Sequence, residues 1–221
     1  MKSTIAVFLA LFALSAHAWE VEASVGQTQY QGPPNTIWHQ ANFPNTFDLK
    51  SNSWSVGVTD YLAPQVRWRA AFVNLGNTSS SAQATSDANY NSTNHCTTGP
   101  CPLNTYRTEG SIRGFSFTLA PETRISPTMK AFVEAGLFVF QPKFYADVAT
   151  CANCTPFDRQ QYSDGWKVGP QIGFGVEHVP TKTQVVLTAY RVDTPSQNEA
   201  AVPNWQGWAI NVALRHTFWG M

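Results

Sequence analysis

The chain has 221 residues, enough for one large β domain or two small mixed domains, and 13% of them are charged, about half the fraction usual in soluble domains. Fourteen basic and fourteen acidic residues give zero net charge, which argues against a nucleic-acid-binding protein with a basic face. Hydrophobic residues make up 43% of the chain, yet mean hydropathy is −0.22. Apolar and polar residues must therefore be finely interleaved, and no long apolar helix is expected.

The N-terminus has the pattern of an export signal. Lys2 precedes an apolar run from Ile5 to Leu14, and Ala16-His17-Ala18 supplies the small residues that signal peptidase accepts. A transmembrane helix is the alternative, but about ten apolar residues fall short of the roughly 20 that span a bilayer. We expect residues 1–18 to be a signal peptide and residues 19–221 to form the mature domain.

Export to an oxidising compartment favours disulfides. The four cysteines are Cys96, Cys101, Cys151 and Cys154, which fall in two expected loops. Three pairings stay open, two local rings or either of two arrangements that join the loops. The alternatives are a four-cysteine zinc site, which needs reduced thiolates, and a redox centre, which lacks a surrounding βαβ pattern.

Beyond the signal, apolar residues recur at every second position, the period of a β-strand. The last strand is clearest, with Trp208, Ile210, Val212, Leu214, His216 and Phe218 on one face. Eight strands are expected, at residues 19–31, 52–62, 65–75, 109–119, 129–140, 166–178, 183–192 and 206–218.

The side on which the residues face is ambiguous in two of these strands. Arg113 shares the apolar phase, so either a β-bulge shifts the register or this charge faces outward near a rim. In the seventh strand the odd set, Val185, Leu187 and Ala189, is chosen as outward.

The connections alternate in length. Short links at 63–64, 120–128 and 179–182 alternate with long, polar segments at 32–51, 76–108, 141–165 and 193–205. This alternation predicts an up-and-down antiparallel barrel with all four long loops at one end. An even number of strands then places both chain termini at the other end.

The placement of charge and tryptophan predicts that the apolar face meets lipid. The charged residues on the face opposite the apolar set are Glu20, Glu22, Arg67, Arg69, Lys130, Glu134, Lys167, Glu177 and Arg215. Two aromatic belts are expected, one of Trp19, Trp68 and Trp219 and the other of Trp54, Trp166 and Trp208. Glycines on the polar face leave room for long side chains inside a narrow barrel.

We therefore expect an all-β fold, a closed eight-stranded transmembrane β-barrel with an interior ion-pair network. A soluble barrel of the lipocalin kind would need the Trp-rich face to turn inward.

The signal, the strand pattern and the final strand from Trp208 to Phe218 resemble the small outer-membrane β-barrels of the OmpA/OmpX/OmpW type. The resemblance implies the outer membrane of a Gram-negative bacterium, contact with lipid and lipopolysaccharide, and assembly by the barrel-assembly machinery. Trp219-Gly220-Met221 follow Phe218, whereas the closing strand of that family usually ends on an aromatic residue. OmpW-like relatives have an apolar lumen that takes small hydrophobic molecules. Phe132, Phe138 and Phe140, on the inward phase, leave room for that alternative.

Enzymes resembling this class remodel lipid A with a His, a Ser and an acidic residue near the outer rim. His216 and His178 are expected near short turns, which does not fit, and His39 with Asp48 and Ser51 in the first long loop is a weak match. Metal-ligand spacing and nucleotide fingerprints are also missing from the sequence. We expect no enzymatic activity, no catalytic residue, no metal and no cofactor.

The expected role is structural or in surface interaction, with the interior plugged by ion pairs and the barrel monomeric. A surface ligand would bind through the loops, which the cysteines stiffen. The loop aromatics available as contact points are Trp38, Phe43, Tyr90, Tyr106, Tyr145 and Phe157.

Overall fold

The computed structural model describes residues 19–31, 45–85, 103–150, 160–163, 165–193 and 206–218. The expected signal peptide at 1–18 lies outside this part of the chain. No helix among the described residues is long and apolar enough to cross a membrane.

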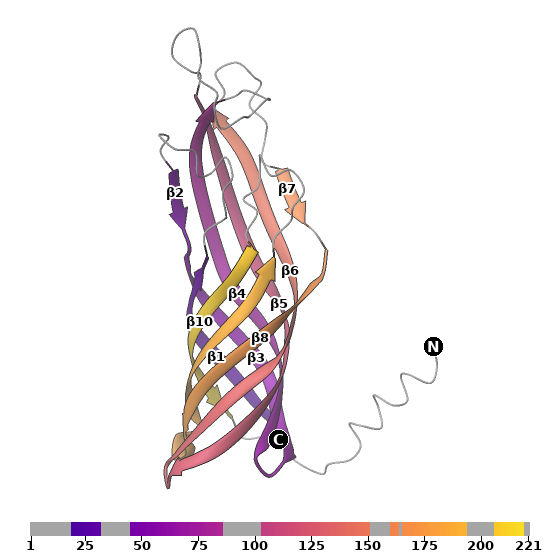
Figure 1. Ribbon diagram of the computed structural model, residues 1–221, viewed down its shortest axis with the longest axis vertical. Coiled ribbons are helices and arrows are strands. Elements are labelled where there is room, and N and C mark those ends of the chain that lie inside the picture. The colour runs from indigo at the N-terminus through magenta and orange to yellow at the C-terminus, as the bar shows by residue number, and fades with distance from the viewer. Residues whose placement is uncertain are drawn as a thin grey trace, which may run out of the picture.

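Eight strands form a closed antiparallel ring (Figure 1). They are β1 (Glu20–Tyr30), β3 (Lys50–Ala63), β4 (Val66–Thr85), β5 (Leu103–Ser126), β6 (Met129–Thr150), β8 (Lys167–His178), β9 (Thr183–Asp193) and β10 (Gln206–Thr217). Each strand pairs with the next one around the ring, and β1 closes it against β10, with Val25 opposite Leu214. The expected fold class is confirmed.

Three strands are much longer than the sequence pattern predicted. β4, β5 and β6 have 20, 24 and 22 residues, so much of the expected loops 76–108 and 141–165 is strand. Two short strands, β2 (Asn45–Asp48) and β7 (Gln160–Ser163), pair with β4 and β6 and complete a five-stranded sheet at the loop end (Figure 1). Residues 77–83 are almost all polar on both faces, so the chain shows no alternation there although its backbone pairs throughout.

The short turns also differ from expectation. The link expected at 120–128 is a turn at 127–128, because β5 continues to Ser126. The other two short connections are a turn at 64–65 and a 3-10 turn at Val179–Thr181, labelled η2. Extending β5 adds a further inward-facing charge, Glu122, to the lumen.

A bulge marks the place where the ring ends and the long sheet begins. The β4–β5 register shifts between Asn74 and Asn77, above which β4 pairs with β2 and no longer with β3. Gly76 has a φ of +82°, a backbone conformation in which side chains are strained. The Tyr30 hydroxyl lies 3.1 Å from the carbonyl oxygen of Leu75 and 3.2 Å from that of Gly76, within donating distance of both. The bulge is therefore stabilised from β1.

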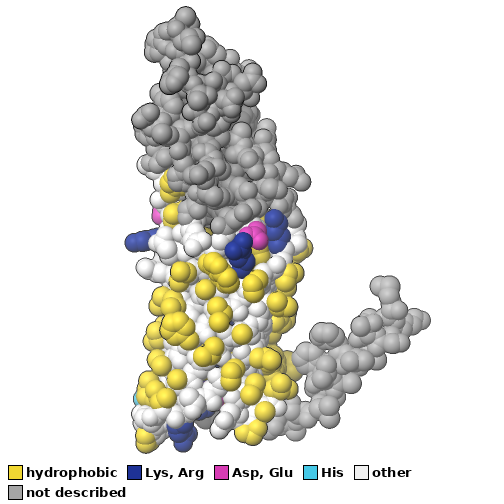
Figure 2. All heavy atoms as spheres, viewed as in Figure 1, with side chains coloured by type: hydrophobic (Ala, Val, Ile, Leu, Met, Phe, Trp, Pro, Cys, Tyr) yellow, Lys and Arg dark blue, Asp and Glu magenta, His cyan; other side chains and the backbone are white. Residues whose placement is uncertain are grey.

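The two faces of the ring are inverted relative to a soluble barrel. The exposed fractions of Trp54, Val168 and Leu214 are 44%, 63% and 52%, whereas Arg67 and Glu177 are each 6% exposed. Figure 2 shows apolar side chains over the lower wall and charged ones at the upper border of this band. Because an apolar exterior is stable only in contact with hydrocarbon, the wall is built to sit in a membrane.

Both ambiguous registers are settled by burial. In β9 the odd residues face outward, with Val185 exposed and Val186 buried. Arg113 is exposed and lies on the outward phase of β5, and Gly114 and Ile112 on either side of it are buried. The bulge lies in β4, so Arg113 is the outward-facing charge near the rim.

Gly76 offers a test of the bulge. A Cβ at this position would overlap Ser51 and the carbonyl of Asn52, so Gly76→Ala should lower the free energy of unfolding by about 3 kcal/mol, combining left-handed strain with overlap. Urea unfolding of the detergent-folded barrel, followed by tryptophan fluorescence, measures this.

Gly165→Ala is the matched control. Gly165 also has a positive φ, +68°, but open space surrounds its Cβ position. Gly165→Ala should lower the free energy of unfolding by only about 1 kcal/mol, because the left-handed backbone is strained but the new methyl group overlaps nothing. Equal losses in the two variants would show that close packing at the bulge contributes nothing.

Candidate functional site

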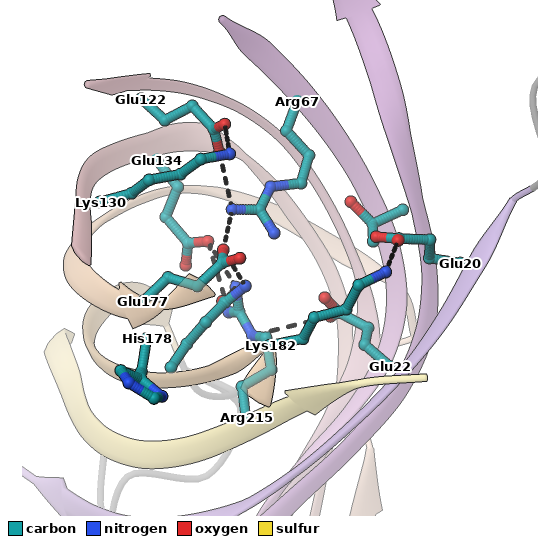
Figure 3. Close-up of polar contacts among 12 residues, drawn as sticks. Glu20, Glu22, Arg67, Glu122, Lys130, Glu134, Glu177, His178, Lys182 and Arg215 are labelled. Atoms are coloured by element: carbon teal, nitrogen blue, oxygen red, sulfur yellow. Dashed lines mark hydrogen bonds and ion pairs between the residues drawn. The ribbon is translucent and has the colours of Figure 1, made fainter. Parts of the chain in front are cut away.

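The turn-end half of the lumen holds a set of ionised side chains that face one another across the ring (Figure 3). They come from strands far apart in the sequence, and each sits on the inward phase of its strand. Their pairing forms two clusters, which we call the lower and the upper cluster. Their charged side chains are buried except that of Lys130, which is 19% exposed.

The lower cluster is centred on Arg67 of β4. Its guanidinium donates to Glu122 of β5 at 2.8 Å and to Glu177 of β8 at 2.6 Å. Lys130 of β6 pairs with Glu122 at 2.5 Å and also contacts the Tyr61 hydroxyl at 3.0 Å. The Tyr61 hydroxyl donates to Glu122 at 2.8 Å. Two bases thus face two acids, and the cluster is neutral.

The upper cluster joins Arg69 of β4, Arg215 of β10, Glu22 of β1 and Glu134 of β6. Arg69 donates to Glu22, and the Arg215 Nε lies 3.7 Å from the same carboxylate. The Arg215 Nη1 is 3.3 Å from Glu134, which also accepts from the Thr188 hydroxyl at 3.0 Å. This cluster is again two bases against two acids. The attraction between these paired charges and their additional hydrogen bonds offset the cost of taking the ions out of water.

Gln184 of β9 links the two clusters. It is fully buried, its amide nitrogen donates to Glu177 at 2.9 Å, and its amide oxygen accepts from Arg215 at 3.2 Å. A neutral side chain that both donates and accepts can satisfy a carboxylate on one side and a guanidinium on the other. The eight charges therefore form one connected layer across the barrel.

The structure brings together seven of the nine expected network residues, namely Glu22, Arg67, Arg69, Lys130, Glu134, Glu177 and Arg215. Glu20 lies instead at the rim, paired with Lys182. Lys167 lies at the opposite end of β8, opposite Phe140 in register, so its expected place in this network is wrong.

Sequence reasoning missed Glu122, Gln184 and Tyr61. Glu122 fell in a stretch assigned to a turn. A signal was present, because the outward phase of Phe117 and Leu119 continues through Pro121, which leaves Glu122 on the inward phase. No comparable pattern identifies Gln184 and Tyr61, because a polar residue near a turn can face either solvent or the lumen.

Above the ion pairs, the lumen is filled by apolar side chains. Members of this apolar layer include Tyr30, Leu75, Ile112, Phe138, Phe140, Phe144, Tyr190 and Val192. Phe138 stacks on Phe140 with ring centroids 5.2 Å apart and lies 4.9 Å from the Tyr190 ring. A residual cavity of about 10 Å³ touches both Tyr190 and Arg215, room for about one water molecule.

Phe132 lies apart from the apolar layer. It packs in a smaller cluster with Ala120 and Val186, and the Arg67 guanidinium carbon lies 5.7 Å from its ring centroid. The expected inward phase of Phe132, Phe138 and Phe140 is observed, and all three rings are buried.

On the lipid-facing side, aromatic rings form a continuous line near the loop end. Trp54 contacts Phe72 at 5.6 Å, Phe72 contacts Phe115 at 5.5 Å, and Phe115 stacks on Trp166 at 6.0 Å between centroids. Trp208 lies half-buried on the outward phase of β10. Rings in such a line suit the boundary between hydrocarbon and water.

At the turn end, Trp19 meets Trp68 edge to face at 5.8 Å. Trp219 lies outside the described residues. The histidines His178 and His216 are also at this end, where their Nδ1 atoms lie 2.8 Å and 3.2 Å from the hydroxyls of Thr181 and Thr183.

Several expected sites fall outside the described residues. These are Cys96, Cys101, Cys151, Cys154, His39, Trp38, Phe43, Tyr90 and Phe157. Asp48 and Ser51 lie in β2 and β3. In the part of the chain that the structure describes, no three His, Cys, Asp or Glu residues are grouped to hold a metal ion.

A closed antiparallel barrel with an apolar exterior, aromatic rings at both borders and ion pairs inside defines an integral membrane β-barrel of the outer-membrane type. Proteins of this class reside in the outer membrane of Gram-negative bacteria, with short periplasmic turns and longer extracellular segments.

Comparison with known proteins gives no match to a protein-family model and none to a curated protein. Among solved structures, Ail, the attachment invasion locus protein of Yersinia pestis, is 9% identical, with a TM-score of 0.44 and coverage of 90% of this chain and 97% of Ail. Neisserial surface protein A is 10% identical, with a TM-score of 0.40 and coverage of 92% and 99%. The translocator domain of NalP from Neisseria meningitidis is 12% identical, with a TM-score of 0.32 and coverage of 98% and 94%. Likenesses this distant concern architecture alone.

Arg215 tests the ion-pair layer. Arg215→Leu leaves Glu134 and Glu22 with fewer partners in a buried site, so it should lower the free energy of unfolding by about 3–5 kcal/mol. Arg191→Leu removes a rim pair whose side chains are 41% and 49% exposed and should cost less than about 1 kcal/mol. Urea unfolding in detergent measures both variants.

The double variant Arg215→Leu/Glu134→Leu removes both partners and should recover part of the loss, since the remaining Arg69 and Glu22 still balance. If Arg215→Leu unfolded like the unaltered protein, the buried pairing would have no energetic weight.

Proposed function

We propose that this protein is a non-conducting outer-membrane barrel, its lumen plugged by the ion-pair and apolar layers, with a structural or surface-interaction role. The observation that carries the proposal is the filling of the lumen. Two neutral ion-pair clusters and a packed aromatic layer occupy successive levels of the ring, and the cavity that touches both Tyr190 and Arg215 measures only about 10 Å³.

Ion passage requires a continuous wet path. An interior of an eight-stranded barrel is only wide enough for side chains, and here the side chains on opposite walls contact one another directly, as Arg67 of β4 does with Glu177 of β8. Opening a path would separate buried charges in a medium where each unpaired ion costs several kcal/mol. The ion-pair layer therefore supports the proposal that the lumen is closed to ions.

The loop-end sheet supports the surface role. β4, β5 and β6 carry the paired backbone well beyond the aromatic line, so the barrel presents a rigid, polar surface outside the membrane. Lipid and lipopolysaccharide around the wall, the assembly machinery during biogenesis and a ligand at this surface are the proposed partners, and the barrel is proposed to be a monomer. The proposed role needs no catalysis, and the disulfides of the loops remain part of the proposal.

An OmpW-like transporter of small hydrophobic molecules is the second candidate. The buried rings of Phe138, Phe140 and Tyr190 favour it, because they give the loop-end half of the lumen an apolar character. These rings contact one another with centroids 4.9–5.2 Å apart, so a solute would have to displace them and would then meet the ion-pair layer. The plugged barrel fits this packing better.

Planar-bilayer recordings test the plug. The purified barrel should show no steady conductance above the baseline of the bare bilayer, whereas a general porin inserted in the same way shows open-channel steps. Resolved, reproducible steps from the wild-type protein would contradict the proposal. In liposomes, faster entry of an apolar solute would instead favour the transporter.

A further inference from the structure

The outward face of the loop-end sheet contains a hollow that the proposed plug does not use. Two adjoining depressions of about 390 Å³ and 370 Å³ share Asp48, Ser79 and Glu109. We call the two together the outer groove. Their volumes fall in the range of small-molecule sites.

Strand register explains why these residues meet. Asp48 of β2 lies opposite Ser79 of β4, Ser79 opposite Glu109 of β5, and Glu109 opposite Tyr145 of β6. Since neighbouring strands are about 4.8 Å apart, this row crosses roughly 14 Å of sheet. Side chains two positions along a strand share its face, so Arg107 and Asn77 lie in the rows on either side.

The depth of the groove comes from side-chain size. The floor carries the small hydroxyl residues Ser79, Ser81 and Ser111, and longer side chains, those of Glu109, Arg107 and Tyr145, rise between and beside them. Because this face belongs to paired strands, its backbone is held by the same ladder that builds the barrel. The groove is thus preformed on a rigid sheet.

The lining selects the chemistry of an occupant. Serine and threonine hydroxyls both donate and accept, carboxylates accept two or more hydrogen bonds, and a guanidinium only donates. A ligand rich in hydroxyls can satisfy all three at once, with its C–H face against the Tyr145 ring. Two carboxylates against one guanidinium disfavour phosphorylated or sulfated ligands, and the polar floor disfavours hydrocarbon.

The height of the groove above the membrane supports the same class of ligand. On β5, Phe115 belongs to the aromatic line, Arg113 is the next outward residue, and Glu109 lies two outward positions further. Six residues at about 3.4 Å each, on a strand tilted about 40°, place Glu109 roughly 15 Å above the ring line. In an outer leaflet of glycolipid, that is the level of the sugar chains.

We propose that the outer groove binds an uncharged saccharide segment. In this arrangement, Asp48 and Glu109 accept hydrogen bonds from sugar hydroxyls, Arg107 donates to them, and Tyr145 packs against the ring. The inference deepens the surface-interaction role proposed above and rests on it. Closure of the lumen does not enter into it, so a conducting barrel would leave this inference unaffected.

The test uses the full chain folded in detergent. Isothermal titration or ligand-observed NMR with lactose, maltotriose and a neutral outer-core oligosaccharide of lipopolysaccharide should show binding by at least one of them. Glu109→Gln keeps the size of the side chain and should weaken that binding at least tenfold. Ser79→Phe, which fills the floor, should abolish it.

Asp193→Asn is the matched control. It also neutralises an exposed acidic side chain, at the end of β9 and paired with Arg191, and should leave saccharide binding unchanged. Each variant is first shown to be folded by its unboiled migration on SDS gels. Absence of binding by all the sugars, or equal affinity of Glu109→Gln and the wild type, would overturn the proposal.

A second pair of titrations distinguishes a saccharide of the same membrane from a soluble or host glycan. They use mixed micelles that contain either lipopolysaccharide with its core sugars or lipid A alone. Groove-dependent binding to the first and not to the second identifies a glycolipid of the same membrane. Binding confined to free oligosaccharides identifies a soluble or host glycan. A preference of the wild type for lipid A alone, unchanged in Glu109→Gln, would contradict a saccharide site.

Discussion

The structure depends on one constraint, that no polar group inside the hydrocarbon layer can rely on water. The backbone meets it by ring closure, since the pairing of β1 with β10 leaves no open edge in the wall. The charged side chains meet it by pairing across the lumen, where Arg67 reaches Glu122 and Glu177. An apolar exterior and an ionic interior are two results of the same requirement.

The lumen is organised by level. The four acids and four bases of the two clusters lie toward the turns, and the packed rings of Phe138, Phe140 and Tyr190 lie toward the loops. Glycines of β6 and β8 make this packing fit, as at Gly175, where a Cβ would overlap the ring of Phe132. A large side chain on one strand lies opposite a glycine on the neighbouring strand, as Phe132 does opposite Gly175, so the interior is filled without widening the ring.

Much of this was predictable from the sequence. The alternation of Val168, Ile172 and Phe174 with small or polar residues predicts both the strand and its lipid-facing side, because a strand with one apolar face has an apolar residue at every second position. The extension of β4 was missed because residues 77–83 are almost uniformly polar and carry no such period. The sequence also does not predict which charged residues pair with one another in the lumen. That Arg215 meets Glu134 of β6, across the lumen, depends on the register of every strand between them.

The distribution of ionic partners over the ring bears on biogenesis. Every acid in the two clusters is matched by a base from another strand, and Arg215, on the final strand, completes pairs with residues of β1 and β6. An intermediate that lacks β10 would leave the buried Glu134 carboxylate without the Arg215 guanidinium, whereas the lower cluster and the Arg69–Glu22 pair need no residue of β10. Arrival of the last strand supplies the guanidinium that compensates Glu134, so we expect chains that lack this strand to be less stable than the complete barrel.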